Sequence, residues 1–260
     1  MFLPRISLII TAFNAEEYLK ETLENVFRAL HFYQGKMGHD VEIIVADCGS
    51  TDKTVGVVEE YNVKVVPCTG KRQLSAARNA GAKIAKGRYL AFLDAGSLVS
   101  ENIFCIVDYY LSSERVVGGG TIMYPDSPSF FLNWGFAILM FLQRLMKISG
   151  GFVYCLRSAF EVAGGFNETL WALDDLELVR RFREIGRKEG KLVIRIEDGF
   201  VLTRFQVFDR IKVGNFLHFL FGFMLPTVFK FVFYPEDKLR KFLQNKEFWF
   251  KYYYGPQDAS

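Results

Sequence analysis

The sequence is poor in cysteine and histidine, and neither residue is clustered. Its 4 cysteines, Cys48, Cys68, Cys105 and Cys155, form no Cys-x-x-Cys pair, and only 3 histidines accompany them. This spacing argues against a zinc site and a disulfide framework, and it predicts reduced, mostly buried thiols. The N-terminus lacks the pattern of a signal peptide, because residues 6–11 resemble a core strand. We therefore expect a cytoplasmic protein, where thiols stay reduced.

The chain also has little excess charge. Its formal net charge is +3, which is too small to indicate a nucleic-acid-binding protein, since these usually carry a strongly basic stripe. Half of the residues are hydrophobic, and this excludes a disordered chain. A length of 260 residues allows one large domain or two small ones.

Four short apolar runs alternate with helical patterns in the first 120 residues. The runs predict strands buried on both faces at residues 6–11, 41–47, 63–66 and 89–94. The helical patterns predict helices at residues 14–30, 52–60, 75–86 and 100–111. Asn14 and Glu17 resemble a capping box for the first helix, and Gly87 is expected to end the third. This alternation predicts a parallel, doubly wound α/β sheet that binds ligands at the carboxyl ends of its strands.

Two carboxylates stand directly at the ends of predicted strands. Asp47 and Asp94 each follow four or five apolar residues, so each is expected at the rim of the sheet rather than in a loop. We interpret Ser97 and residues 50–52 as turn formers and helix caps, the ordinary use of such side chains. Two acids at the rim of one sheet indicate a site, either for a cation or for a base and its sugar.

Six segments, taken in order, resemble the successive motifs of family 2 glycosyltransferases. They are residues 7–14, 42–54, 77–81, 87–96, 164–168 and 173–178. Each motif is weak alone, but their order over residues 5–205 makes the resemblance specific. It implies the GT-A fold, which is Rossmann-like with a mainly parallel sheet and flanking helices, over residues 1–205. Residues 1–120 would then bind the nucleotide sugar, and residues 121–205 would bind the acceptor.

The resemblance also implies a donor site for a nucleotide sugar. By similarity, the nucleoside pocket is lined by Thr11, Ala12, Phe13 and Asn14. Asp47 would accept a hydrogen bond from the base. The diphosphate needs positive charge, and the basic candidates are Lys71, Arg72 and Arg78. A solvated basic face is an equal alternative for the first two, and Arg78 could instead brace the loops at the strand tips.

Asp94 and Ala95 also face the donor by similarity, and Asp94 is the candidate ligand for Mg²⁺ or Mn²⁺ on the diphosphate. The family usually has a second acid two residues later, where this chain has Gly96. Mg²⁺ accepts one or two protein carboxylates together with substrate phosphates. We therefore expect weak cation binding by the empty protein, with more of the diphosphate charge neutralised by Arg and Lys.

The acceptor half must supply a carboxylate that takes the proton from the attacking hydroxyl. A helix is predicted from Asp174 to about residue 185, and its spacing places Asp175 on the apolar, inward face. The spacing and the family motif both select Asp175 as the catalytic base. Asp174 is interpreted as an acceptor-side residue and a helix-start acid. The turn at Gly164 and Gly165, with Phe166, is assigned to the acceptor side.

Aromatic residues gather near the C-terminus. Of the 42 aromatics, 17 lie in residues 201–260, where they are mixed with Lys and Arg. Rings and cationic groups together suit the membrane headgroup boundary, so residues 206–260 are expected to form an amphipathic helical segment on the membrane. Two charge-free runs, residues 127–143 and 213–229, are shorter than the roughly 20 residues that a spanning helix prefers. The alternatives are a buried core, contact between two copies in a homo-oligomer, and a membrane span by residues 213–234.

The sequence therefore predicts an inverting glycosyltransferase at the cytoplasmic face of the cell membrane. It would move a sugar from a nucleotide-diphosphate donor to a lipid-linked or cell-surface glycan acceptor. Two hypotheses compete with it: a non-catalytic relative that binds a nucleotide or a partner, which Gly96 favours, and a nucleotidyltransferase. Asp175 and the turn at Gly164 and Gly165 favour the transferase over both.

Overall fold

The structure is a computed structural model that describes residues 3–68, 73–125, 152–171, 173–203 and 244. Its strands are β1 (Ile6–Ala12), β2 (Val41–Asp47), β3 (Lys64–Pro67), β4 (Tyr89–Asp94), β5 (Ser97–Val99), β6 (Val116–Pro125), β7 (Val153–Leu156) and β8 (Leu192–Thr203). Its helices are α1 (Glu16–Met37), α2 (Thr54–Glu59), α3 (Leu74–Ile84), α4 (Ile103–Ser112), α6 (Arg157–Ala163) and α7 (Asp174–Glu189). The α/β class predicted from the sequence is confirmed.

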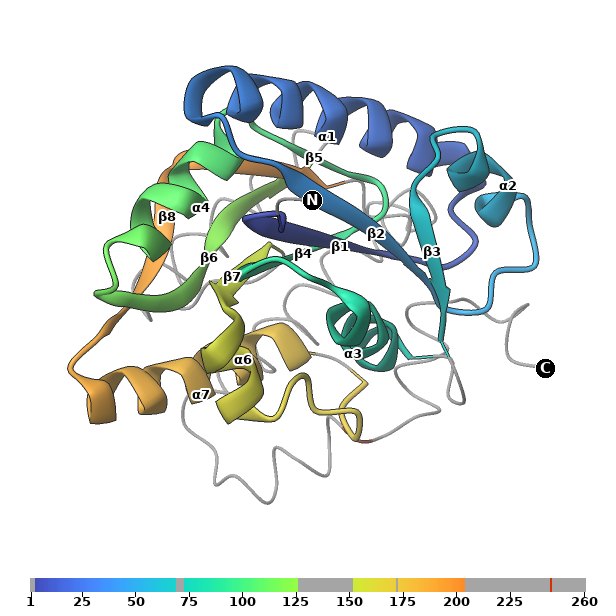
Figure 1. Cartoon of the computed structure of the whole chain (residues 1–260). Coiled ribbons are helices and arrows are strands. Elements are labelled where there is room, and N and C mark those ends of the chain that lie inside the picture. Colours follow the sequence, from blue (N-terminus) through green and yellow to red (C-terminus); the bar gives the residue numbers. More distant parts are fainter. Residues whose placement is uncertain (1–2, 69–72, 126–151, 172, 204–243, 245–260) are drawn as a thin grey trace.

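Within the described residues, the strands form one mixed sheet in the order β3-β2-β1-β4-β7-β6-β8-β5 (Figure 1). The first four in this order are parallel, as the sequence predicts. All seven residues of β1 are buried, because the strand lies between β2 and β4 with helices on both faces. In the register, Ala12 lies beside Asp47 and Thr11 lies beside Asp94. The end of β1 is therefore flanked by both strand-tip carboxylates.

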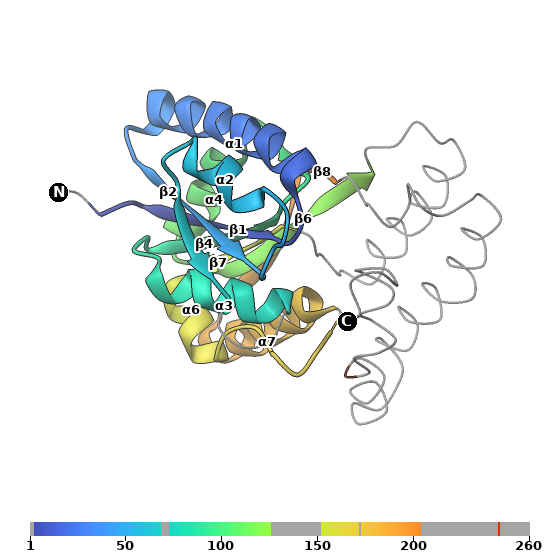
Figure 2. The ribbon, with the colours of Figure 1, turned by 90° about the vertical axis from the view of Figure 1, so that its right-hand side faces the viewer.

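Helices cover both faces of the sheet (Figure 2). On one face, α1 and α4 bury apolar side chains such as Leu19 and Phe104 in one core cluster. On the other face, α3, α6 and α7 contribute Ala77, Phe160 and Leu178 to a second cluster. The two clusters sandwich the parallel strands, so the strand tips are held by packing on both sides.

The half of the chain that is predicted to bind the acceptor joins the same sheet. β7 pairs antiparallel with both β4 and β6, and β6 runs parallel to β8 with an irregularity between Thr121 and Ile122. The short strand β5 pairs antiparallel with the end of β8. Strands from both predicted halves of the chain thus belong to one sheet. The division of the chain into these two halves stays a prediction.

The predicted capping box at Asn14 and Glu17 is wrong. Ala15 precedes α1, and Asn14 adopts a left-handed backbone with φ 44°. The carboxylate of Asp52 instead accepts hydrogen bonds from the N–H groups of Glu16 (3.1 Å) and Thr54 (2.9 Å). One acid therefore serves the starts of both α1 and α2, and a cap from another loop takes the place of the local one.

Two glycines mark close backbone approaches. The prediction that Gly87 ends the third helix is wrong, because α3 ends at Ile84. A Cβ on Gly87 would instead lie 2.5 Å from the backbone nitrogen of Ser7. A Cβ on Gly119, in β6, would lie 1.7 Å from the carbonyl oxygen of Ile194 in β8. Both positions therefore need a residue without a side chain.

All four cysteines lie in the described part of the chain, where Cys48 and Cys155 are buried and Cys68 and Cys105 are half-buried. Burial raises the pKa of the Cys48 thiol to about 12, so this thiol stays protonated at neutral pH. Lys71, Arg72 and the aromatic runs at residues 127–143 and 206–260 lie outside the described residues, apart from Gln244. Among the helices of the described part, none is both long and apolar enough to cross a membrane.

Candidate active site

The strand-tip site centres on Asp94 at the end of β4. Its Oδ1 accepts a hydrogen bond from the Thr11 hydroxyl at 2.6 Å and an ion-paired hydrogen bond from Nη2 of Arg78 at 2.7 Å. The Asp94 side chain is 38% exposed, whereas that of Arg78 is 8% exposed. Asp94 is thus held from two sides and still reaches solvent. Thr11 is buried, so its hydroxyl serves to position Asp94.

Asp47 organises the loop that follows β2. It is 7% exposed, and its carboxylate accepts hydrogen bonds from the N–H groups of Gly49 and Ser50, each at 3.2 Å. The side chain of Asn14 accepts a hydrogen bond from the N–H of Thr51 at 2.8 Å. The loops after β1 and β2 are therefore tied together, beside the half-buried Phe13. The interpretation of residues 50–52 as turn formers and caps agrees with these contacts. The same interpretation of Ser97 is wrong, because Ser97 begins strand β5 and its hydroxyl lies 3.1 Å from that of Thr203.

Gly96 stands where the second acid of the family motif is expected. Its backbone has φ 86°, a left-handed conformation that glycine adopts at little cost. Its N–H donates to the Thr22 hydroxyl of α1 at 3.0 Å, and the N–H of Ala95 donates to the carbonyl of Thr11 at 2.8 Å. The backbone after Asp94 is thus folded onto α1 in a shape that disfavours any side chain at residue 96.

Arg78 lies in α3 and braces the strand tips, one of the two roles considered for it. Besides Asp94, it binds Asp174, with 2.6 Å between Nη1 and Oδ2. Its guanidinium carbon lies 5.2 Å from the centre of the Phe166 ring. Burial acts to lower its pKa, but the carboxylates of Asp174 and then Asp94 raise the pKa well above its ordinary value. Arg78 is therefore cationic, and two protein carboxylates already match its charge.

The start of α7 corrects the prediction for its two acids. Asp174 is the inward residue: it is 8% exposed and paired with Arg78. Asp175 is half-buried, and its Oδ1 accepts a hydrogen bond from the N–H of Leu176 at 2.8 Å. The interpretation of Asp174 as only a helix-start acid is therefore incomplete. Asp175 keeps more access to solvent than Asp174 does.

The turn that ends α6 is built from two consecutive glycines. Gly164 and Gly165 have φ values of 78° and 75°, so the predicted tight turn is confirmed. A Cβ on Gly165 would lie 2.7 Å from Oδ1 of Asn79. The backbone at Gly165 therefore lies close to α3. The ring of Phe166 packs edge-on against Phe92, with centroids 4.8 Å apart. Phe166 is thus a core residue that anchors the acceptor-side loop.

Asn79 ties α3 to the loop that carries Phe166, a role that sequence reasoning passed over. Its amide donates to the carbonyl of Phe166 at 2.9 Å, and its side-chain oxygen accepts from the N–H of Phe166 at 2.8 Å. Gln73, at the start of α3, donates to the carbonyl of Leu170, and Gln244 donates to the Thr169 hydroxyl at 3.2 Å. The signal was the position of Asn79 directly after Arg78 in a motif-like segment.

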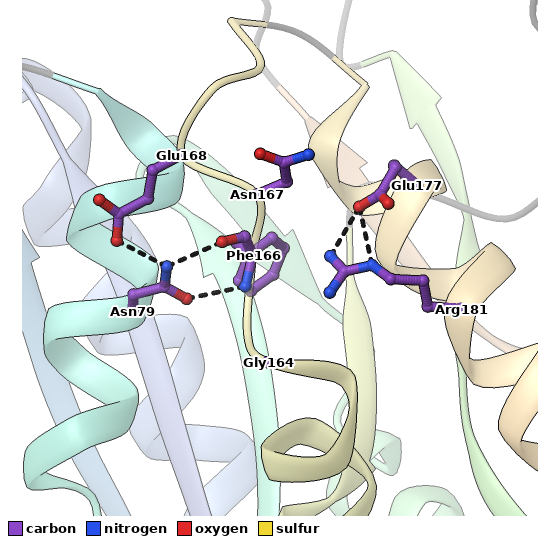
Figure 3. Close-up of a pocket in the computed structure, with 7 residues that line it drawn as sticks. All are labelled: Asn79, Gly164, Phe166, Asn167, Glu168, Glu177 and Arg181. Carbon is purple, nitrogen blue, oxygen red and sulfur yellow. Dashed lines mark hydrogen bonds and ion pairs between the residues drawn. The ribbon is translucent and has the colours of Figure 1, made fainter. Parts of the chain in front are cut away.

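A pocket of about 460 Å³ opens between α3 and α7 (Figure 3). It is lined by Asn79, Gly164, Phe166, Asn167, Glu168, Glu177 and Arg181. Its charged and amide groups largely bind one another: Arg181 pairs with Glu177 at 2.6 Å, and Asn79 donates to Glu168 at 2.8 Å. None of the strand-tip residues lines it, so we assign these contacts to support of the loop.

Residues 7–211 match the model of glycosyl transferase family 2. The chain therefore belongs to this family, which confirms the resemblance found in its motifs and favours that resemblance over the nucleotidyltransferase hypothesis. Glycosyltransferase GlyG of Streptococcus pneumoniae is 28% identical over 77% of this chain and 64% of its own length. WfaP of Escherichia coli, a UDP-Glc:alpha-D-GlcNAc-diphosphoundecaprenol beta-1,3-glucosyltransferase, is 28% identical over 44% of this chain and 49% of its own length.

Solved structures support the same fold. The mannosyltransferase PcManGT of Pyrobaculum calidifontis, in complex with GDP-Man and Mn²⁺, matches with a TM-score of 0.62 and 20% identity, over 79% of this chain and 58% of that one. Residues 1–349 of TarS from S. aureus, with UDP-GlcNAc, match with a TM-score of 0.54 and 18% identity, over 68% of this chain and 52% of that one. The GT-A fold is thus confirmed. This chain spans less than two thirds of the length of each of these relatives and structures.

Proposed function

We propose that the protein transfers a sugar from a nucleotide-diphosphate donor to a hydroxyl of a lipid-linked or cell-surface glycan acceptor, with inversion at the anomeric carbon. One observation carries this proposal. A continuous set of contacts joins the tip of β1, the carboxylate at the tip of β4 and the start of α7, through Thr11, Asp94, Arg78 and Asp174. Donor and acceptor groups of one transfer reaction must meet at such a point.

The donor would bind across the ends of β1, β2 and β4. Ala12, Phe13 and Asn14 would line the nucleoside pocket, and the Asp47 carboxylate would accept a hydrogen bond from the base beside the loop that it orders. The solved structures of similar fold hold GDP-Man or UDP-GlcNAc, which supports a nucleoside diphosphate sugar as the donor class. Lys71 and Arg72 remain candidates for the diphosphate.

A divalent cation would find a small set of protein ligands here. The described residues contain no group of three or more His, Cys, Asp or Glu side chains that could hold a metal ion. Asp94 is the one strand-tip carboxylate with the partial exposure to face a diphosphate, and Gly96 adds no second acid. Mg²⁺ or Mn²⁺, if held by Asp94 and phosphate oxygens, would neutralise charge on the leaving diphosphate.

Asp175 would act as the base. Its carboxylate would take the proton from the acceptor hydroxyl as that oxygen attacks the anomeric carbon, and the nucleoside diphosphate would leave from the opposite face. A single displacement of this kind inverts the anomeric configuration. Asp174, which is paired with Arg78, would hold the start of α7, and the loop with Gly164, Gly165 and Phe166 would border the acceptor.

The proposed acceptor and cellular location are supported by one relative and by the composition of the chain. WfaP is named for a lipid-linked acceptor, a GlcNAc-diphosphoundecaprenol. Aromatic and basic residues are mixed in residues 206–260 of this chain, a composition that suits a membrane surface. We therefore propose a peripheral protein at the cytoplasmic face of the cell membrane, acting in glycan synthesis for the cell envelope.

A thermal-shift panel tests the donor class. We expect the melting temperature to rise with one or two of UDP-glucose, UDP-N-acetylglucosamine and GDP-mannose, because a ligand that binds only the folded state stabilises it. The rise should be larger with Mn²⁺ than without it, whereas Mn²⁺ alone should have little effect, since phosphate oxygens complete its shell. If no nucleotide sugar shifts the melting temperature, the proposal loses its donor, and a non-catalytic relative becomes the better reading.

Asp47→Ala should weaken binding of the donor that the panel identifies. The change removes the acceptor for the base and also the acceptor for the loop after β2. We expect the dissociation constant to rise by about 5- to 150-fold, which corresponds to roughly 1–3 kcal/mol for a lost buried partner. Isothermal titration calorimetry measures the dissociation constant. Asp40→Ala is the control, because Asp40 is exposed and lies at the end of β2 opposite to Asp47. An unchanged dissociation constant would show that the nucleoside assignment is wrong.

A further inference from the structure

One guanidinium group joins the donor end of the sheet to the start of α7. Nη2 of Arg78 lies 2.7 Å from Oδ1 of Asp94, and Nη1 lies 2.6 Å from Oδ2 of Asp174. Both nitrogens belong to one rigid, planar group. The two distances therefore fix the two carboxylates relative to each other, although they lie on different elements, one at the tip of β4 and one at the first residue of α7.

Arg78 is itself firmly held. It is 7% exposed, and Phe166 lies under its guanidinium. Breaking one member of a buried ion pair leaves an uncompensated charge, which is strongly unfavourable. The side chain therefore cannot leave one carboxylate without a large cost, and it acts as a fixed connection.

The backbone directly before α7 has an unusual conformation that the Arg78 contact helps to hold. Leu173 has φ 55°, a left-handed conformation that is strained for a residue with a Cβ. Such a conformation persists only when surrounding contacts determine it. Asp174, the residue after this junction, is held by its ion pair with Arg78. Asp175 is the next residue, so the place of its carboxylate depends on how Asp174 is held.

We propose that Arg78 is a positioning residue: through Asp174, it sets the place of the Asp175 carboxylate relative to the donor end of β4. The proposal rests on the function proposed above, in which Asp175 is the base. Arg78 touches no reacting atom in this role. Its loss should therefore lower turnover more than it weakens donor binding, and it should loosen the residues around the start of α7.

Hydrogen exchange tests the structural half of the proposal without any ligand. Arg78→Lys keeps a positive charge but has one nitrogen, which cannot reach both carboxylates as a guanidinium does. In the full chain, amide exchange over residues 164–176 should become about tenfold faster, while exchange in β1 and β2 stays at the wild-type rate. The matched control is Arg5→Lys, which makes the same change where a guanidinium pairs with buried Asp108 at the opposite end of the sheet.

The outcomes of this measurement are distinct. Unchanged exchange over residues 164–176 would overturn the proposal. Faster exchange throughout the sheet would also overturn it, because Arg78 would then be a general stability residue. If Arg78→Lys does not fold, Asp174→Asn is nearly isosteric and takes its place, with the same expected result.

Turnover tests the functional half. The rate of hydrolysis of UDP-glucose, UDP-N-acetylglucosamine and GDP-mannose, each with Mn²⁺, is measured for wild type and variants. Arg78→Lys should lower kcat by about 10- to 100-fold and change the KM of the donor by less than threefold. The double variant with Asp174→Asn should lose no more than the worse single variant, because the two residues act as a unit.

Additive losses, or a raised KM with unchanged kcat, would overturn the proposal; the second result would make Arg78 a diphosphate contact. A wild-type protein that hydrolyses none of the three donors would count against the proposed function. The exchange measurement would still decide whether Arg78 holds the start of α7, so the two failures can be told apart.

Discussion

Asp175→Asn is expected to lower turnover by about 10²- to 10⁴-fold, the range for loss of a general base. Asparagine keeps the shape of the side chain and can still accept the hydrogen bond from the N–H of Leu176, so α7 should begin as in the wild type. It cannot take a proton from the acceptor hydroxyl. Donor binding, measured by calorimetry, should therefore stay within about threefold of wild type while kcat falls.

The control for this variant is Glu177→Gln, the same chemical change about half a turn further along α7. Glu177 pairs with Arg181, not with the strand tips, so its turnover should stay within about threefold of wild type. The product of the wild-type reaction should have the anomeric configuration opposite to that of the donor. Near-normal turnover in Asp175→Asn, or retention of configuration, would remove Asp175 from the role of base.

Gly119→Ala is expected to lower the free energy of unfolding by about 3 kcal/mol, at the upper end of the cost of overpacking. The added Cβ would lie 1.7 Å from the carbonyl oxygen of Ile194 and 3.1 Å from the hydroxyl of Tyr154. The first contact is backbone, which cannot rotate away, so β6 and β8 would have to separate. The melting temperature should fall by roughly 6–12 °C in thermal denaturation followed by circular dichroism.

Gly56→Ala provides the matched control. Gly56 lies in α2, where an added Cβ would meet nothing within 4 Å, and alanine favours the helix by about 1 kcal/mol. This variant should melt at or slightly above the wild-type temperature. If Gly119→Ala has the same melting temperature as Gly56→Ala, then β6 and β8 do not approach as closely as described.

The parallel half of the fold was readable from the sequence because its strands are short apolar runs with helical patterns between them. β1, for example, is buried over all seven residues, and so it stands out against its neighbours. Strands β6 and β7 give no such signal. β6 contains Gly118, Gly119 and Gly120, which have low strand propensity, and β7 has only four residues.

The contacts between the predicted site residues could be read from the sequence only in part. Periodicity placed Asp175 on the inward face of α7, whereas Asp174 is the buried acid. The reason is Arg78, which lies 96 residues earlier in the chain and selects the acid that it can reach. Helical spacing describes one helix, and it carries no information about a charge that another helix presents.

The pairing of β5 with β8 sets the order in which the protein can be completed during synthesis. β5 directly follows the loop at Gly96, but Ser97 meets Thr203 across 106 residues of chain. At about 5–20 residues per second, a ribosome needs roughly 5–20 s to make that interval. Throughout this time, the strand next to the donor loop lacks its ladder partner. A nascent chain would therefore expose an unpaired edge beside the tip of β4, and chaperones that cover such edges would act on it during this interval.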